Sequence, residues 1–154
     1  MNEYEERLKE IIQKNNIQAE HLSFEQSCHS VEEAANAANV APEDFVKNIC
    51  MMDSNGNFIV AIVKGEDRAS TSRVANALRI ERPRIASPDE ILEKTGFPCG
   101  GTPSFGYEAK FLIDPKVMDK EVIYSGGGSQ NSLVKISTKE LQKANNGIIA
   151  RVRK

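Results

Sequence analysis

The chain has 154 residues, of which 40% are hydrophobic. A chain of this length forms one globular domain that buries roughly 70% of the surface exposed by its unfolded form, so we expect a single domain over residues 1–154. The 20 lysines and arginines against 22 aspartates and glutamates give a formal net charge of -2. This balance excludes an overall positive field that would hold long stretches of DNA or RNA, and any contact with RNA must be local.

Cysteine usage and the N-terminal segment bear on compartment and cofactors. Cys28, Cys50 and Cys99 are far apart and form no C-x-x-C pair, which argues against a disulfide framework and a structural zinc site. Residues 1–15 carry charges throughout and lack the apolar core of a signal peptide, and no later run approaches the length of a membrane span. We therefore expect a cytoplasmic protein with no metal, no cofactor and no membrane partner.

The N-terminal part of the chain predicts a helix, a strand and a second helix. Apolar residues at helical spacing among charged ones indicate an amphipathic helix over 2–15. Residues 17–24 mix polar and apolar side chains over the length of a strand. The Ser-Val-Glu-Glu sequence at 30–33 is typical of a capping box and predicts that a helix begins there, before the alanines that follow.

A hairpin and a third helix are predicted next. The apolar segments 45–52 and 58–63 flank Asn-Gly at 55–56, the pair that a tight hairpin turn with positive φ prefers. We expect two antiparallel strands from this pattern. A serine or threonine at 70–72 can cap a helix that runs to residue 78.

A further helix and an irregular loop follow. Residues 87–90, Ser-Pro-Asp-Glu, combine a capping serine, a proline at the first helical position and a glutamate three residues on, and the helix should end at Gly96. From Gly96 to Tyr107 the composition turns to Gly, Pro, Cys, Thr and Ser without any periodicity, which indicates a loop. Apolar runs at 111–113 and 122–124 predict two more strands.

The C-terminal part completes the expected fold. Three glycines at 126–128 form a loop before a strand at 133–136. A third capping box opens a helix over 137–144, Gly147 ends it, and residues 148–152 can return as a final strand. The elements predict an α+β domain with a mixed, mostly antiparallel sheet or partial barrel and surrounding helices.

Lys47 is a candidate catalytic residue because it lies within an apolar strand. Strand alternation would point it to the same face as Phe45 and Ile49, so its ammonium would lie near the interior or a cleft. A lysine on an edge strand that extends to water is the structural alternative. The spacing alone leaves both interpretations open.

The loop at 95–106 is the second candidate for chemistry. Its sequence is Thr-Gly-Phe-Pro-Cys-Gly-Gly-Thr-Pro-Ser-Phe-Gly, and such small residues could present several backbone N–H groups to one oxygen. These donors would suit an ester carbonyl that gains negative charge. An ordinary surface connection has a similar composition, so this loop does not decide the function by itself.

Taken together, the motifs resemble those of a known family. Their order is Ser-Val-Glu-Glu-Ala-Ala at 30–35, the lysine at 47, Thr-Gly-Phe-x-x-Gly-Gly-x-x-x-Phe-Gly at 95–106, and the later triple glycine. This order looks like the YbaK and prolyl-tRNA synthetase-associated editing domains, over residues 20–145. Members of that family hydrolyse misacylated transfer RNA, so the resemblance implies a YbaK-like fold and an aminoacyl-tRNA deacylase.

The resemblance also implies roles for particular residues. Lys47 would hold a phosphate or carbonyl at the terminal adenosine, and the backbone from Gly100 to Ser104 would surround the aminoacyl group. The catalytic candidates are therefore Lys47, Gly100 and Gly101. The substrate-binding candidates are His29, Ser30, Thr102, Pro103, Ser104, Phe105, Gly106, Gly126, Gly127 and Gly128.

Two features depart from the family's pattern. The family's loop usually reads Gly-x-x-x-Pro, whereas here Pro103 comes one place early and Ser104 occupies the expected proline position. Some prolyl-editing members also carry an aspartate in the strand after the second glycine loop, but residues 133–136, Leu-Val-Lys-Ile, contain no acid. The resemblance therefore leaves the edited amino acid open.

Other residues offer weaker candidates. Cys99 invites a thiol-nucleophile interpretation, but the spacing implies neither His21 nor His29 as its partner. Asp114 before Pro115 is more typical of a helix cap than of a general acid. A group of arginines could touch acceptor-stem phosphates or form an ordinary exposed helix face. These arginines are Arg68, Arg73, Arg79, Arg82 and Arg84.

We expect a trans-editing hydrolase that deacylates mischarged aminoacyl-tRNA, with a small amino acid on tRNA-Pro or a related tRNA as substrate. Lys47 and the loop offer positioning and oxyanion donors but no base, and the resemblance suggests that a ribose hydroxyl of the terminal adenosine activates the water. The expected partners are the aminoacyl-tRNA acceptor end and, as a further candidate, an aminoacyl-tRNA synthetase. The alternative is a non-catalytic module that binds a nucleotide or an RNA terminus with the same loops.

Overall fold

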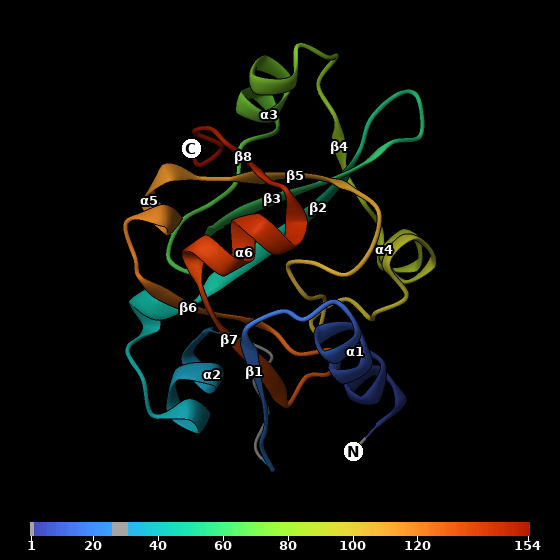
Figure 1. The fold of residues 1–154 in the computed structure, drawn as a ribbon. Helices are drawn as coiled ribbons and strands as arrows, with labels where there is room; N and C mark the ends of the chain where they lie inside the picture. The colour runs from blue at the N-terminus through green and yellow to red at the C-terminus, as the bar shows by residue number, and fades with distance from the viewer. Residues whose placement is uncertain (1, 26–30) are drawn as a thin grey trace.

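Two β-sheets with helices around them form the fold, which confirms the predicted α+β class (Figure 1). The computed structural model describes residues 2–25 and 31–154. The strands are β1 (Ala19–Ser23), β2 (Val46–Met52), β3 (Phe58–Lys64), β4 (Arg84–Ile85), β5 (Lys110–Ile113), β6 (Val122–Gly126), β7 (Ser132–Ser137) and β8 (Ile148–Ile149). The helices are α1 (Glu3–Lys14), α2 (Val31–Ala38), α3 (Thr71–Leu78), α4 (Pro88–Thr95), α5 (Pro115–Met118) and α6 (Thr138–Asn145), with a 3-10 turn η1 (Pro42–Asp44) before β2.

The strands divide between a small and a larger sheet. The three-stranded sheet has the order β1-β7-β6, and the five-stranded sheet has the order β4-β2-β3-β5-β8. The pairings are mostly antiparallel, but β5 runs parallel to both β3 and β8. A backbone bridge between Phe45 and Tyr124 links the two sheets, which do not close into a barrel within the described residues.

Most helix ends follow the caps that the sequence predicts. The helix α3 begins after its Ser70 cap, and Ser87 and Glu90 form the complete capping box at the start of α4. The helix α4 ends at Gly96 with a φ of 80°, a left-handed conformation that glycine adopts without a steric penalty. The cap predicted at Ser30 lies outside the described residues.

The last helix differs from its prediction at both ends. Ser137 caps α6 by accepting the N–H of Glu140, but the Glu140 carboxylate accepts the N–H of Gln18 and does not complete a capping box. The helix ends at Asn145 and is capped by Asn146, which has a φ of 54°, so the predicted stop at Gly147 is one residue beyond the cap. Asparagine can replace glycine here because its short polar side chain tolerates the left-handed conformation.

The predicted hairpin is confirmed. Its strands pair antiparallel from Val46 opposite Lys64 to Met52 opposite Phe58, and Gly56 in the turn has a φ of 82°. The short edge strand β4 beside this hairpin had no sequence signal, because two residues are too few to show an alternating pattern.

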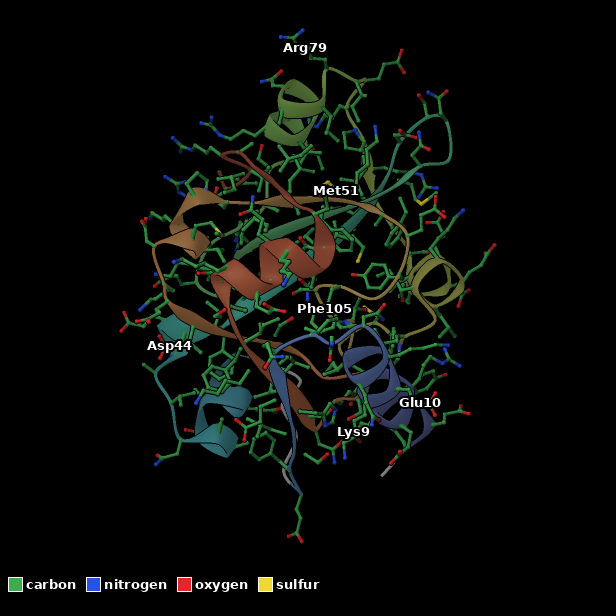
Figure 2. All side chains as sticks on the ribbon, in the orientation of Figure 1. Lys9, Glu10, Asp44, Met51, Arg79 and Phe105 are labelled. Carbon is green, nitrogen blue, oxygen red and sulfur yellow. The ribbon has the colours of Figure 1, made fainter. Side chains whose placement is uncertain are left out.

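Three apolar clusters hold the elements together. The main cluster combines residues of both sheets with Leu8 of α1 and Phe105, which lies inside the molecule in Figure 2. A second cluster packs α3 against the five-stranded sheet through Val74, and a third packs α2 against the three-stranded sheet through Ala35 and Tyr124. In Figure 1, α3 lies at the opposite end of the molecule from α1 and α2.

The Asp114 carboxylate ties the C-terminal residues to the sheet. Its side chain is 1% exposed and accepts the N–H groups of Lys116, Val152 and Arg153 at 2.9–3.1 Å, and the Arg153 guanidinium at 2.8 Å. Asp114 thus caps α5, as predicted. Burial alone would raise the pKa of Asp114, but these donors outweigh it and hold the pKa below its ordinary value. Because Val152 and Arg153 donate to this carboxylate, β8 ends at Ile149, short of the predicted residue 152.

We expect Asp114→Asn to lower the free energy of unfolding near neutral pH by about 1–3 kcal/mol, because buried donors lose a charged acceptor. Because the pKa of Asp114 is lower in the folded state than the value of about 3.9 in the unfolded state, its ionised carboxylate stabilises the fold above that pH. This stabilisation is lost as the pH falls through the lower pKa of the folded state. The difference in the free energy of unfolding between Asp114→Asn and the wild type should therefore become smaller below about pH 4. Urea unfolding across this range measures it, with the exposed Asp119→Asn as control. A difference that stays constant with pH would contradict this role.

Candidate functional site

The two glycine loops lie backbone against backbone. The N–H of Gly128 donates to the carbonyl of Gly101 at 2.7 Å. A Cβ atom at Gly101 would lie 2.7 Å from the carbonyl carbon of Gly128, and a Cβ atom at Gly126 would lie 2.2 Å from the carbonyl oxygen of Thr102. Real Cβ atoms do not approach backbone so closely, so only glycine at these positions allows the two loops to meet.

A buried polar network fixes the first loop to the sheets. The Asn48 Nδ2 group donates to the Thr102 carbonyl at 2.9 Å and to Ser125 Oγ at 3.3 Å, while Asn48 Oδ1 accepts the Ser104 hydroxyl at 2.6 Å. Ser104 and Ser125 are 2.5 Å apart at their Oγ atoms and are almost fully buried. Since the Ser104 proton goes to Asn48, Ser125 must donate to Ser104. The Ser104 carbonyl accepts Asn145 Nδ2 at 3.0 Å.

In this network the Ser104 hydroxyl holds the first glycine loop against the strands that carry Asn48 and Ser125. A proline at this position, as the family pattern has it, could not donate to Asn48. The side chains of Ser104 and Phe105 are both 0% exposed, so neither presents a surface to a ligand in this structure. Thr102 is 8% exposed and Pro103 is buried, whereas Gly100 is exposed. What the loop can offer to a substrate is therefore mainly its backbone.

Three backbone donors of the two loops are unpaired, although the residues that carry them are buried. Across residues 2–25 and 31–154, the N–H groups of Thr102, Ser104 and Gly127 donate to no other residue. Unpaired N–H groups at a glycine-rich turn attract anions and oxygen atoms that gain negative charge. The arrangement could therefore hold a carbonyl oxygen or a phosphate, while Gly106 at the far end of the loop lines a separate hollow of about 610 Å³ between α1 and α6.

Lys47 lies next to Asn48 on β2. Its Cα pairs with Val63 in the hairpin, and alternation places its side chain on the opposite face of the strand from Asn48. Two residues before it, Phe45 bridges Tyr124, so this end of β2 runs beside β6 toward the second glycine loop. Within the described part of the chain, the half-buried side chain of Lys47 makes no hydrogen bond or ion pair. It lies on the face of β2 opposite the one from which Asn48 contacts Thr102 and Ser104 of the first loop.

The histidines and cysteines that the structure describes do not form a catalytic pair with one another. His29 lies outside the described residues, as does the substrate-binding candidate Ser30. The Nε2 atom of His21 lies 2.8 Å from the Gly127 carbonyl, and its buried Nδ1 has no partner. Cys99 is exposed and has no hydrogen bond to a described histidine, while burial raises the pKa of Cys50 to about 12. These contacts give no support to a thiolate nucleophile.

The arginine group lies away from the glycine loops. Arg84 forms an ion pair with Glu90 at 2.7 Å, and Arg82 donates to Thr71 at 2.6 Å. Figure 2 shows Arg79 pointing outward beyond α3, at the end of the molecule opposite α1. Arg73 lies within α3 and Arg79 caps its end, whereas Arg84 lies in β4, so the interpretation as an exposed helix face fits the first two. Among the residues described, no group of His, Cys, Asp and Glu side chains could hold a metal ion, and no helix is long and apolar enough to cross a membrane.

Three residues that shape the loops were not predicted from the sequence. Asn48 and Ser125 stand in apolar strands, where a polar residue on the core-facing side is itself a signal of a buried network. Glu5 of α1 is 4% exposed and accepts the Ser129 hydroxyl at 3.0 Å. No periodicity could have found this contact, because an acidic residue in the first turn of a helix has an ordinary reason to be there.

The chain is similar to proteins of a known family. The profile of the aminoacyl-tRNA editing domain family matches residues 25–144. The uncharacterized protein YwhH of Bacillus subtilis (strain 168) is 25% identical over 122 residues, which are 78% of this chain and 77% of that protein. The proline–tRNA ligase of Syntrophus aciditrophicus (strain SB) is 24% identical over 106 residues, which are 68% of this chain but only 18% of the ligase.

A solved structure extends the likeness over the whole chain. It belongs to a protein described as a candidate trans-editing enzyme for prolyl tRNA synthetase, and it superposes with a TM-score of 0.92 over 100% of this chain and 99% of that one. The two sequences are 20% identical, so this match concerns the fold. The expected YbaK-like editing fold is confirmed by it.

We expect Asn48→Ala to lower stability and loosen the first glycine loop, because the Ser104 hydroxyl and the Thr102 carbonyl lose their partner. Each buried group left unsatisfied costs about 1–3 kcal/mol of unfolding free energy. Urea unfolding measures the loss, and Asn76→Ala on the exposed face of α3 is the matched control. Equal stability of the two variants would show that the network contributes nothing.

Proposed function

The chain belongs to the aminoacyl-tRNA editing domain family, and we propose that it is a trans-acting hydrolase that cleaves the ester bond of mischarged aminoacyl-tRNA. The observation that carries this proposal is the contact between the two glycine loops, with unpaired N–H groups at Thr102 and Gly127. The unpaired ammonium of Lys47 stands on the strand that anchors the first loop. These groups suit an ester whose carbonyl gains negative charge beside an anionic nucleotide.

The proposed reaction is an attack of water on the ester carbonyl carbon. The loop backbone around Gly100 and Gly101 surrounds the ester, and unpaired N–H groups of the loops hold the carbonyl oxygen as it becomes an oxyanion, because the Gly101 N–H already donates to the Pro98 carbonyl at 3.0 Å. Lys47 holds a phosphate or carbonyl of the terminal adenosine. The bond to the ribose oxygen then breaks, and that oxygen takes up a proton. The neighbouring ribose hydroxyl orients or activates the water, because Glu5, the carboxylate among the described contacts of the loops, is buried and already accepts the hydroxyls of Ser23 and Ser129.

The proposed substrate is a small amino acid on tRNA-Pro or a related tRNA. The support comes from proline–tRNA ligases, which match this chain over a part of their length. The absence of an acid over 133–136 and the serine at 104 leave the identity of the amino acid to experiment. An aminoacyl-tRNA synthetase is the proposed protein partner, and the site of translation, the cytoplasm, is the proposed location.

The second candidate function is a non-catalytic module that binds a nucleotide or an RNA terminus. It is favoured by the replacement of the family's proline by Ser104, whose buried hydroxyl holds the loop instead. The same N–H groups could cradle a phosphate without any reaction. The two functions differ in one observable, the release of the amino acid.

We expect the protein to deacylate at least one member of a panel of mischarged tRNAs that includes alanine, serine and cysteine on tRNA-Pro. Release of labelled amino acid measures the reaction, with correctly charged prolyl-tRNA as the control. Activity should survive a chelator and Cys99→Ser, because the proposed reaction uses neither a metal nor a thiol. Tight binding of the RNA end without release of any amino acid would instead establish the binding module.

We expect Lys47→Ala to lower the single-turnover rate of deacylation by roughly 10²- to 10³-fold, the range found when one electrostatic donor is removed from an active site. Thermal unfolding should change little, because the ammonium has no partner in the described structure to lose. Lys110→Ala, on the exposed start of β5, is the matched control. Unchanged turnover by Lys47→Ala would remove Lys47 from the mechanism.

A further inference from the structure

The helix α1 and strand β1 precede the part of the chain that the family profile matches, which begins at residue 25. They nevertheless form hydrogen bonds with the second glycine loop. We propose that Glu5 of α1 is a positioning residue that holds this loop, residues 126–129, in the shape in which it meets the first loop. The inference rests on the proposed function for its catalytic consequence, but the positioning itself can be measured without any reaction.

The burial of Glu5 is the first observation. Its side chain is 4% exposed, and its carboxylate accepts the hydroxyls of Ser23 and Ser129. A carboxylate in such surroundings is costly unless donors reach it, so the loop must adopt the one shape that delivers the Ser129 hydroxyl. Ser129 also contacts Ser132 Oγ at 2.6 Å and Asn131 at 2.9 Å, and these contacts extend the network to the start of β7.

The close approach of α1 to Gly128 is the second observation. A Cβ atom at Gly128 would lie 3.0 Å from the Tyr4 carbonyl oxygen, and the φ of Gly128 is 100°. The first turn of α1 therefore lies directly against the residue whose N–H donates to Gly101. A short path runs from Glu5 through Ser129 and Gly128 to the first glycine loop.

The N-terminal segment also holds both loops at other points. The Nε2 atom of His21 lies 2.8 Å from the Gly127 carbonyl, and Ser23 pairs with Ser132 in the β1–β7 ladder. On the other side of α1, Arg7 donates to the Gly96 carbonyl at 2.7 Å and lies over the Phe97 ring. The helix thus spans from the second loop to the start of the first.

A purely structural contact would not need a charged group at this position. Replacing a buried charge by an apolar residue is often neutral or favourable for stability, so the carboxylate is better explained by the geometry that it imposes on the loop. Glu6 provides the contrast, because it occupies the same first turn but is exposed. Glu5 and Glu6 therefore form a matched pair for experiment.

The test compares Glu5→Gln with Glu6→Gln in the full chain. Amide hydrogen exchange at Gly128 and Ser129 should accelerate in Glu5→Gln only, because their acceptors, the Gly101 carbonyl and Ser132 Oγ, are held in place by the network. Amides of β3 report global stability and should exchange as in the wild type. Single-turnover deacylation should fall roughly 10- to 100-fold in Glu5→Gln, as expected for a small displacement of a reacting site.

Ser129→Ala supplies a second test that removes only one hydroxyl. If Glu5 acts through Ser129, the double variant should be no slower than the slower single variant. The proposal is wrong if the rate reductions of the two single variants multiply in the double variant. It is also wrong if amide hydrogen exchange at Gly128 and Ser129 is unchanged in both single variants. If the wild type deacylates no member of the tRNA panel, the proposed function fails, while the exchange at Gly128 and Ser129 still decides whether Glu5 positions the loop.

Discussion

The hydrogen bond from the Gly128 N–H to the Gly101 carbonyl sets the arrangement of everything near the candidate site. It joins a loop that follows α4 to a loop that follows β6, and it exists only because Gly101 and Gly126 carry no side chain, since a Cβ atom at Gly101 would meet Gly128 and one at Gly126 would meet Thr102. The sheets and helices hold these two loops at the right separation. A Cβ atom on either side would push the backbones apart and so separate the N–H groups that could act on one oxygen.

The first loop is fixed by polar contacts at Ser104, the position at which the resemblance leads one to expect a proline. Proline restricts φ but cannot donate a hydrogen bond, whereas Ser104 leaves φ free and is held by Asn48 and Ser125. Both solutions can give a loop of fixed shape, yet they respond differently to substitution. The serine solution depends on a complete network, because one missing partner leaves several buried groups unsatisfied.

Local signals in the sequence predicted much of the fold. The capping box at Ser87 and Glu90, the hairpin around Gly56 and the cap at Asp114 follow from contacts within a few residues, and all three are confirmed. The early end of β8 could not be foreseen, because it results from Asp114 accepting N–H groups 38 and 39 residues away. The family was recognised from the order of its motifs, but the contacts of Asn48 and Glu5 depend on the folded neighbourhood.

The separation of Glu5 and Ser129 along the chain has a consequence for how the molecule comes to its folded state. Their contact spans 124 residues, whereas the β2–β3 hairpin closes between near neighbours. Contacts between distant residues form slowly, because the intervening chain must give up its freedom before they can be made. The hairpin can therefore form early, whereas the second glycine loop reaches its final shape only after the N-terminal helix has packed against it. During synthesis on the ribosome, a chain that has not yet emerged past residue 129 therefore lacks the assembled pair of loops, whatever part of the β2–β3 hairpin it has formed.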